Sequence, residues 1–229
     1  MKLERNSGIL LHPTSLPDSP VCGSFGNPAR VWLNELAESG IGVWQFLPLA
    51  PTDSFGSPYS SPSSFALNPW FLDQNDLVRD GFLSNNLEDF SSANDCFKNR
   101  VDFHLANSKV KSLRFSLVDD WYKQNRTIQE EFERWCSKQF WLDDHSIFME
   151  LKIQNNDLPW WEWPDEYAGR DKKELENWKK NNQRELLGHK LLQWHLDRQW
   201  KSIRKLAKNL GVFLFGDVPF YVSKDSADV

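Results

Sequence analysis

Three side chains in this sequence could do chemistry because they stand at or just beyond the ends of short apolar runs. His12 and Asp217 each close such a run, and Tyr59 lies in the loop that follows a third. A carboxylate at the position of Asp217 can accept hydrogen bonds from hydroxyl groups, which suits a polyol substrate. Each residue also has a simpler interpretation. His12, which precedes Pro13, could cap a strand end, Tyr59 could be an ordinary loop aromatic, and Asp217 could bind amides of the following turn.

Common catalytic and phosphate-binding motifs are absent. The chain contains no glycine-rich dinucleotide motif, no P-loop, no His-Glu-x-x-His and no Gly-x-Ser-x-Gly. The other histidines have no metal-ligand spacing between them, and we expect packed or surface positions for His104, His145, His189 and His195. The sequence therefore implies neither a metal site nor a cofactor.

The composition of the chain excludes several classes of binding partner. The 229 residues carry a net charge of −5 with no basic stripe, so we expect no nucleic-acid partner. Three widely spaced cysteines give neither a disulfide framework nor a metal site. The start has no signal-peptide pattern and no apolar run is long enough to span a bilayer, so we expect a cytoplasmic protein without a membrane partner.

Residues 41–69 combine an apolar strand with a stiff aromatic loop. The strand has no polar face, which is typical of a buried parallel strand. Five prolines then restrict the loop and hold its aromatic side chains at set positions: Pro48, Pro51, Pro58, Pro62 and Pro69. Of the unusually many aromatic residues, 12 Trp and 16 Phe, we expect most in the core.

The elements that position these residues follow a β/α pattern. Residues 8–47 predict a strand, a helix capped by Asn27 with Pro28 at its first position, and a parallel strand at 43–47. An apolar helix stripe from Leu192 to Leu210 precedes a buried strand at 212–217 with an acid at its end.

Strand spacing indicates a (β/α)₈ barrel with a large insertion. From Ile9 to Val43 is 34 residues, close to the roughly 31 of one barrel unit, whereas from Val43 to Val212 is 169. We therefore divide the chain into strands 1 and 2 with their loop (1–69), a mainly helical insertion (70–190), and a helix with strand 3 (191–229).

Within the insertion, two segments have distinct patterns. Thr127 to Glu130 is a capping-box sequence followed by an amphipathic helix. The run Trp160-Trp161-Glu162-Trp163 is interpreted as a structural cluster, with sugar stacking as the alternative.

Residues 223–229 resemble a cap and the beginning of a helix. Because three parallel strands cannot close a barrel, we expect this chain to be the amino-terminal part of a longer protein.

Several motifs together resemble one enzyme family. They are Ser-Gly-Ile-Leu-Leu-His-Pro-Thr-Ser-Leu-Pro at 7–17, Gly-Ser-Pro-Tyr-Ser at 56–60, Asn-Pro at 68–69, and Gly-Asp-Val-Pro-Phe-Tyr-Val at 216–222 followed by Asp-Ser-Ala-Asp. This set, in this order, is similar to the 4-α-glucanotransferases of glycoside hydrolase family 77, also called amylomaltases or disproportionating enzymes.

The resemblance implies a barrel enzyme that transfers α-1,4-glucan segments to the 4-hydroxyl of glucose or a maltodextrin, with retention and without a cofactor. Retention needs a carboxylate nucleophile and a carboxylic acid/base about 5 Å apart. In this family both lie on later strands, so no catalytic residue is assigned here and these residues alone are expected to be inactive.

The resemblance implies substrate-binding roles for several residues of this chain. Tyr59 matches the tyrosine that packs on the sugar at the cleavage point, and Asp217 matches an acid that bonds to its hydroxyls. Ser57 and Gly56 shape the same loop, and His12 completes the predicted substrate-binding set. Ser60 and Leu67 depart from the usual Gln and Gly, which leaves the neighbouring sugar subsites open.

Two other functions remain as alternatives. The chain could be a non-catalytic glucan-binding or interaction fragment, or part of a related α-glucan hydrolase. The preferred glucan length and the oligomeric state are not specified by the sequence.

Overall fold

The computed structural model of the protein describes residues 5–17, 21–84 and 100–229. Its sheet has three short parallel strands, β1 (Gly8–Leu10), β2 (Val43–Gln45) and β3 (Phe213–Phe215), in the order β1-β2-β3. Gly8 pairs with Val43, which in turn pairs with Phe213. The carboxyl ends of all three strands therefore lie at the same edge of the sheet.

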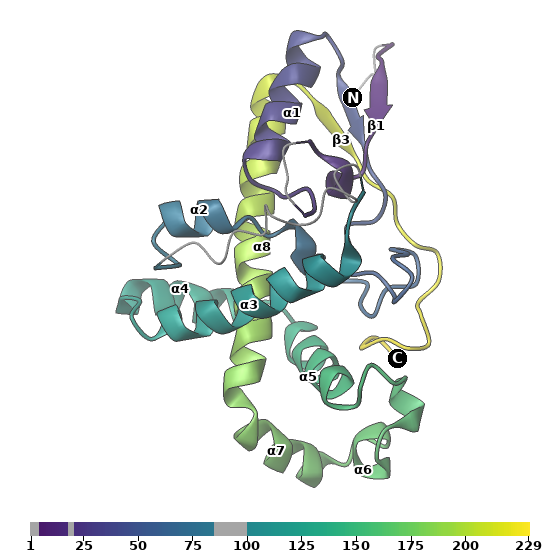
Figure 1. Ribbon diagram of the computed structural model, residues 1–229, viewed down its shortest axis with the longest axis vertical. Coiled ribbons are helices and arrows are strands. Elements are labelled where there is room, and N and C mark those ends of the chain that lie inside the picture. Colours follow the sequence, from purple (N-terminus) through teal and green to yellow (C-terminus); the bar gives the residue numbers. More distant parts are fainter. Residues whose placement is uncertain (1–4, 18–20, 85–99) are drawn as a thin grey trace.

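Two helices cover one face of this sheet. They are α1 (Asn27–Glu38) and α8 (Gln183–Leu210), which run alongside each other beside the strands in Figure 1. The helices and the central strand share one buried cluster, in which Leu33, Trp44 and Ile203 are completely inaccessible to solvent. Burial of such large apolar side chains is the main favourable contribution to folding.

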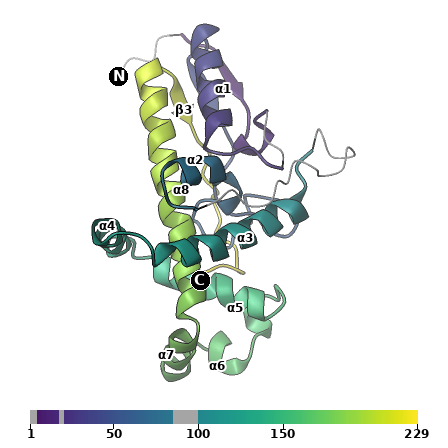
Figure 2. The same cartoon turned by 60° about the vertical axis from the view of Figure 1, so that its left-hand side comes forward.

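Helices dominate the segment between β2 and β3. Helix α3 (Phe103–Trp121) crosses α8 (Figures 1 and 2). Helices α5 (Leu142–Gln154) and α7 (Lys172–Asn181) pack beside the amino-terminal half of α8. The remaining helical elements are the α-helices α2 (Gln74–Arg79), α4 (Arg126–Cys136) and α6 (Asp165–Ala168) and the 3₁₀ turns η1 (Pro13–Ser15), η2 (Pro69–Phe71) and η5 (Trp160–Glu162). Helix α8 is continuous through residue 190, where the sequence placed a domain boundary.

The tryptophan run is mainly structural. Trp163 is buried in a second apolar cluster with Phe148, and its indole N–H donates to the carbonyl of Leu158 at 2.8 Å. Trp160 is half-buried, whereas Trp161 is the one exposed tryptophan among the residues that the structure describes. The expectation that most aromatic residues lie in the core is thus confirmed for tryptophan. It holds less well for phenylalanine, because several rings are exposed, among them Phe55, Phe140, Phe213, Phe215 and Phe220.

Both predicted helix caps were wrong. The residue that precedes α1 is Gly26, not Asn27, because the carbonyl of Gly26 accepts the Arg30 amide at 3.2 Å. Helix α4 begins two residues earlier than the capping box suggested, because the side chain of Asn125 accepts a hydrogen bond from the Ile128 amide. Several local patterns can satisfy the first amides of a helix, and tertiary packing selects among them.

Two further expectations about the last forty residues were wrong. The third strand is not buried on both faces, since 59% of Phe215 is exposed to solvent. Residues 223–229 form turns and no helix, because their acidic side chains bond to other segments. Asp225 pairs with Lys152 of α5 at 2.6 Å, and Asp228 accepts the amide of Ser64 at 2.6 Å.

No helix among the described residues is long and apolar enough to cross a membrane. The cytoplasmic location stays a prediction. Cys96 and the rest of 85–99 lie outside the described residues, as do the first four residues and 18–20.

Candidate functional site

The loop after β2 is organised by a side chain that the sequence analysis missed. Oδ1 of Asp53 accepts the amides of Phe55 at 2.9 Å and of Ser57 at 2.8 Å, while the Asp53 amide donates to the carbonyl of Ser57 at 3.1 Å. Aspartate commonly stabilises a turn by accepting amides two or more residues ahead. The Asp-x-x-Gly spacing between Asp53 and Gly56 was the available signal for this turn.

Gly56 and Ser57 shape the loop through the backbone. Gly56 has φ +83°, and a Cβ there would lie 2.5 Å from Cζ of Phe103. The Phe103 ring in turn stacks on Trp70 with centroids 5.1 Å apart. Oγ of Ser57 accepts the amide of Tyr59 at 3.3 Å. These contacts set the direction in which the Tyr59 side chain leaves the loop.

Tyr59 and Asp217 meet although they are 158 residues apart in the sequence. The Tyr59 hydroxyl donates to Oδ2 of Asp217 at 2.7 Å, and both side chains are exposed. Their contact follows from strand pairing, because β2 leads into the Tyr59 loop and β3 leads directly into Gly216 and Asp217. Two of the sequence-predicted site residues are thus brought together at the carboxyl edge of the sheet.

The electrostatics of this pair favour a neutral phenol beside a carboxylate. The hydrogen bond to Asp217 raises the pKa of Tyr59, and the nearby negative charge acts in the same direction. The phenol therefore keeps its proton at neutral pH. An exposed phenol next to an exposed carboxylate offers an aromatic face and hydrogen-bonding oxygens, and sugars present C–H faces and hydroxyl groups to such surfaces.

His12 is held at the base of the same loop. Its Nδ1 is 2.8 Å from Oγ1 of Thr14, its Nε2 is 3.4 Å from the carbonyl oxygen of Pro48, and its ring packs edge-on against Phe71. Burial lowers the pKa of His12 more than the Pro48 hydrogen bond raises it, so the ring is neutral at pH 7. These contacts match its simpler interpretation as a strand-end cap. No hydrogen bond among the described residues joins His12 to Tyr59 or Asp217.

A buried cluster of titratable groups lies elsewhere, between α3, α5 and α8. Nη1 of Arg114 is 2.5 Å and Nε2 of His189 is 3.0 Å from the same oxygen of Glu150. Burial alone would raise the pKa of Glu150, but the His189 hydrogen bond and the Arg114 charge lower it to about 2. All three side chains are buried, so we assign the cluster to packing between helices and not to catalysis.

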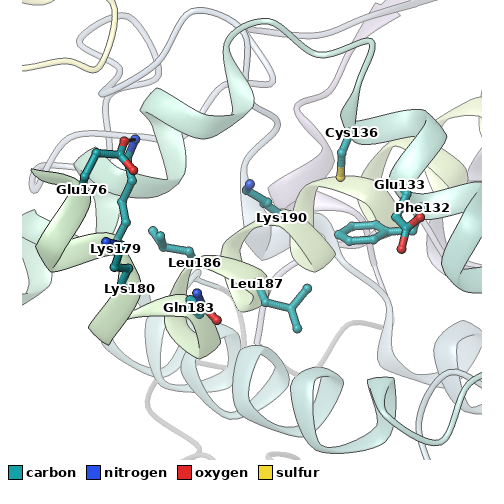
Figure 3. Close-up of a pocket in the computed structure, with 10 residues that line it drawn as sticks. All are labelled: Phe132, Glu133, Cys136, Glu176, Lys179, Lys180, Gln183, Leu186, Leu187 and Lys190. Atoms are coloured by element: carbon teal, nitrogen blue, oxygen red, sulfur yellow. Dashed lines mark hydrogen bonds and ion pairs between the residues drawn. The ribbon is translucent and has the colours of Figure 1, made fainter. Parts of the chain in front are cut away.

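A cavity of about 480 Å³ lies between α4, α7 and α8 (Figure 3). Its lining includes Cys136, Lys180 and Lys190 but no residue of the Tyr59 loop. Burial raises the pKa of Cys136 to about 11, so its thiol remains protonated and is a poor nucleophile at neutral pH. This cavity does not form part of the Tyr59–Asp217 site. Among the described residues, no group of three or more His, Cys, Asp or Glu side chains could hold a metal ion.

Comparison with known proteins decides the family. The family model described as 4-alpha-glucanotransferase matches residues 11–229. The chain belongs to the 4-alpha-glucanotransferase family. It is 37% identical to the enzymes of that name from Synechocystis and Thermus thermophilus, over 99% and 100% of this chain. In both cases it spans 45% of the relative's length.

Solved structures support the same assignment. The amylomaltase from Streptococcus agalactiae in complex with acarbose superposes with a TM-score of 0.88 at 28% identity, over 98% of this chain and 45% of that one. The amylomaltase from Corynebacterium glutamicum, at 17% identity and a TM-score of 0.66 over 97% of this chain and 31% of that one, shares the fold. The resemblance to 4-alpha-glucanotransferases drawn from the sequence motifs is therefore confirmed. The substrate-binding roles of Tyr59, Asp217, Ser57, Gly56 and His12 stay predictions.

Proposed function

We propose that the whole protein containing these residues is a 4-alpha-glucanotransferase. It moves an α-1,4-glucan segment from a donor to the 4-hydroxyl of glucose or a maltodextrin, with retention at the anomeric carbon. One glycosidic bond breaks and one forms, so the number of bonds is unchanged. The donor carbon is held for part of the cycle by a carboxylate nucleophile, as retention requires. That nucleophile and the acid/base are expected on strands that follow Val229.

The contact between Tyr59 and Asp217 carries this proposal. It joins an aromatic ring and a carboxylate at the carboxyl edge of parallel strands, where β/α barrels place their active sites. In the proposal, the ring of Tyr59 packs on a sugar and the Asp217 carboxylate accepts hydrogen bonds from its hydroxyls. Because the two residues already bond to each other, the phenol is oriented before substrate arrives.

We further propose that β1, β2 and β3 are consecutive strands of a (β/α)₈ barrel and that the helices between β2 and β3 are an insertion. The strands are parallel and adjacent in sequence order. One side of β3 carries the exposed rings of Phe213 and Phe215, which are apolar enough to pack against further strands. The boundaries 1–69, 70–190 and 191–229 remain part of this proposal, although α8 crosses the second one.

The test is the product pattern from maltotriose with the whole protein. A transferase converts two maltotrioses into glucose and maltopentaose while the total of reducing ends stays constant. Rising reducing ends without longer products would instead establish the hydrolase alternative. If the whole protein binds maltodextrin but shows neither transfer nor hydrolysis, the result would support the non-catalytic glucan-binding alternative.

A further inference from the structure

Three aromatic rings lie close together at the far half of the Tyr59 loop, and the Tyr59–Asp217 site does not use them. Phe65 comes from the second half of that loop, and Phe140 and Trp141 lie directly before α5. The rings of Phe65 and Trp141 are nearly parallel, at 15° with centroids 6.4 Å apart. Phe140 meets Phe65 edge-on at 5.0 Å. We call these three residues the aromatic platform.

Packing within the described residues does not account for the platform. Phe140 is 81% exposed and Phe65 is 49% exposed, so most of the apolar surface of Phe140 remains in contact with water. Trp141 is half-buried, and no hydrogen bond from the described residues reaches its indole N–H. The exposed rings of Phe65 and Phe140 have the chemistry to bind a ligand that presents apolar C–H faces, as a sugar does.

The backbone beneath Phe65 is held in place before any ligand binds. Oγ of Ser63 accepts the amides of Phe65 at 3.2 Å and of Ala66 at 3.3 Å, and Oγ of Ser61 donates to the Ser63 carbonyl at 2.6 Å. The Ala227 amide also donates to the carbonyl of Pro62 at 2.9 Å. A platform on a rigid segment loses little conformational entropy when it binds.

The position of the platform in the loop favours a glucan as its occupant. Phe65 is six residues beyond Tyr59, and six residues of chain span at most about 20 Å. A linear oligosaccharide that contacts Tyr59 can therefore reach Phe65 after a few sugars. No Lys or Arg is placed over these three rings in the described part of the chain, so no cation competes with a sugar for them.

We propose that Phe65, Phe140 and Trp141 form a stacking subsite for an α-1,4-glucan unit remote from the Tyr59–Asp217 pair, which makes the enzyme prefer long glucans. This inference rests on the proposed function. A short substrate such as maltotriose occupies the Tyr59–Asp217 site without reaching the platform. A longer donor or acceptor gains the additional contact.

The test compares substrate lengths in the whole protein. Phe140→Ala is expected to lower kcat/KM for maltoheptaose about two- to tenfold, the range of one aromatic contact, and to leave kcat/KM for maltotriose unchanged. Phe140→Tyr, which keeps a ring, is expected to retain the preference. Tyr122→Ala removes an exposed aromatic side chain at the end of α3 and serves as the matched control. Equal losses for both substrates, or no loss for either, would overturn the proposal.

A direct binding measurement separates the platform from the reaction. Calorimetric titration of Phe140→Ala with maltoheptaose should give a Kd about two- to tenfold above that of the wild-type protein, whereas the Kd for maltose should not change. If other parts of the whole protein cover the platform, the Kd for maltoheptaose will not change and Phe140→Ala will lower Tm markedly, which contradicts a glucan subsite. Wild-type protein that fails to disproportionate maltotriose would refute the proposed function, while weaker binding of maltoheptaose to Phe140→Ala would still support the platform.

Discussion

The phenolic hydroxyl of Tyr59 donates to the carboxylate of Asp217 at 2.7 Å, which joins the loop after β2 to the turn after β3. Each side chain is exposed, so the bond contributes little to the stability of the fold. The hydrogen bond instead orients the phenol ring relative to the carboxylate at the edge of the sheet. We expect the two residues to act as one unit.

Removing either member of this pair should reduce transfer without unfolding the protein. For the whole protein, Tyr59→Ala and Asp217→Ala are each expected to lower kcat/KM for maltotriose by about tenfold or more, while Tm changes little. The double variant should lose less than the product of the two single losses, because residues in contact are coupled. Steady-state rates and thermal melts measure both effects, and unchanged kcat/KM in either variant would remove that residue from the site.

Gly56→Ala should destabilise the Tyr59 loop for two separate reasons. Its φ of +83° strains any residue with a Cβ, and that Cβ would collide with the Phe103 ring. Gly81→Ala is the matched control, because Gly81 has φ +78° with no heavy atom within 4 Å of the added Cβ. We expect about 1 kcal/mol of destabilisation at Gly81 and about 1–3 kcal/mol more at Gly56. Urea unfolding measures the difference. Equal losses of unfolding free energy in the two variants would show that the Phe103 ring moves aside to make room for the added Cβ.

Breaking the buried cluster between α3, α5 and α8 should be costly. Glu150→Gln removes the charge that Arg114 and His189 share, and leaves a buried guanidinium without its ionic partner. Loss of one member of such a pair costs about 3–5 kcal/mol of unfolding free energy. The control is Glu130→Gln, which removes the exposed ion pair with Arg126 and should cost less than about 1 kcal/mol. Similar values for the two variants would contradict the structural role assigned to the cluster.

Stability should fall in mild acid because buried histidines stay neutral in the folded protein, among them His145 and His195. Burial lowers the pKa of His145 and of His195 to about 3, from an ordinary value of 6.5. Between these values the unfolded chain binds protons that the folded chain does not, so each group contributes stability above pH 6.5 and loses it as pH falls towards 3. The expected slope is up to about 1.4 kcal/mol per pH unit for each histidine.

Unfolding free energies between pH 7.5 and 5 test this expectation. His195→Gln should reduce the slope of unfolding free energy against pH by the contribution of one histidine. This holds even if the variant is less stable at every pH. His104→Gln, at an exposed position, is the control and should leave the profile unchanged. An unaltered slope in the His195 variant would show that this ring is not responsible.

Sequence patterns predicted the elements better than their ends. The strands at 8–10, 43–45 and 213–215 and the apolar faces of α1, α4 and α8 follow from residue order, because side-chain periodicity is a local property. The caps at Asn27 and Thr127 were misplaced since Gly26 and Asn125 make the contacts that begin those helices. The exposure of Phe215 could not be read from the sequence either, as burial depends on what covers a strand.

For the site, the sequence by itself determined which residue types stand at strand ends and, through its motifs, the family. It did not determine that Tyr59 and Asp217 touch, nor that His12 bonds to Thr14 and Pro48 and not to that pair. Only the tertiary structure decided this, because a contact across 158 residues depends on the parallel pairing of β2 with β3. That pairing brings the ends of both strands to one edge of the sheet, where two otherwise separate side chains share a hydrogen bond.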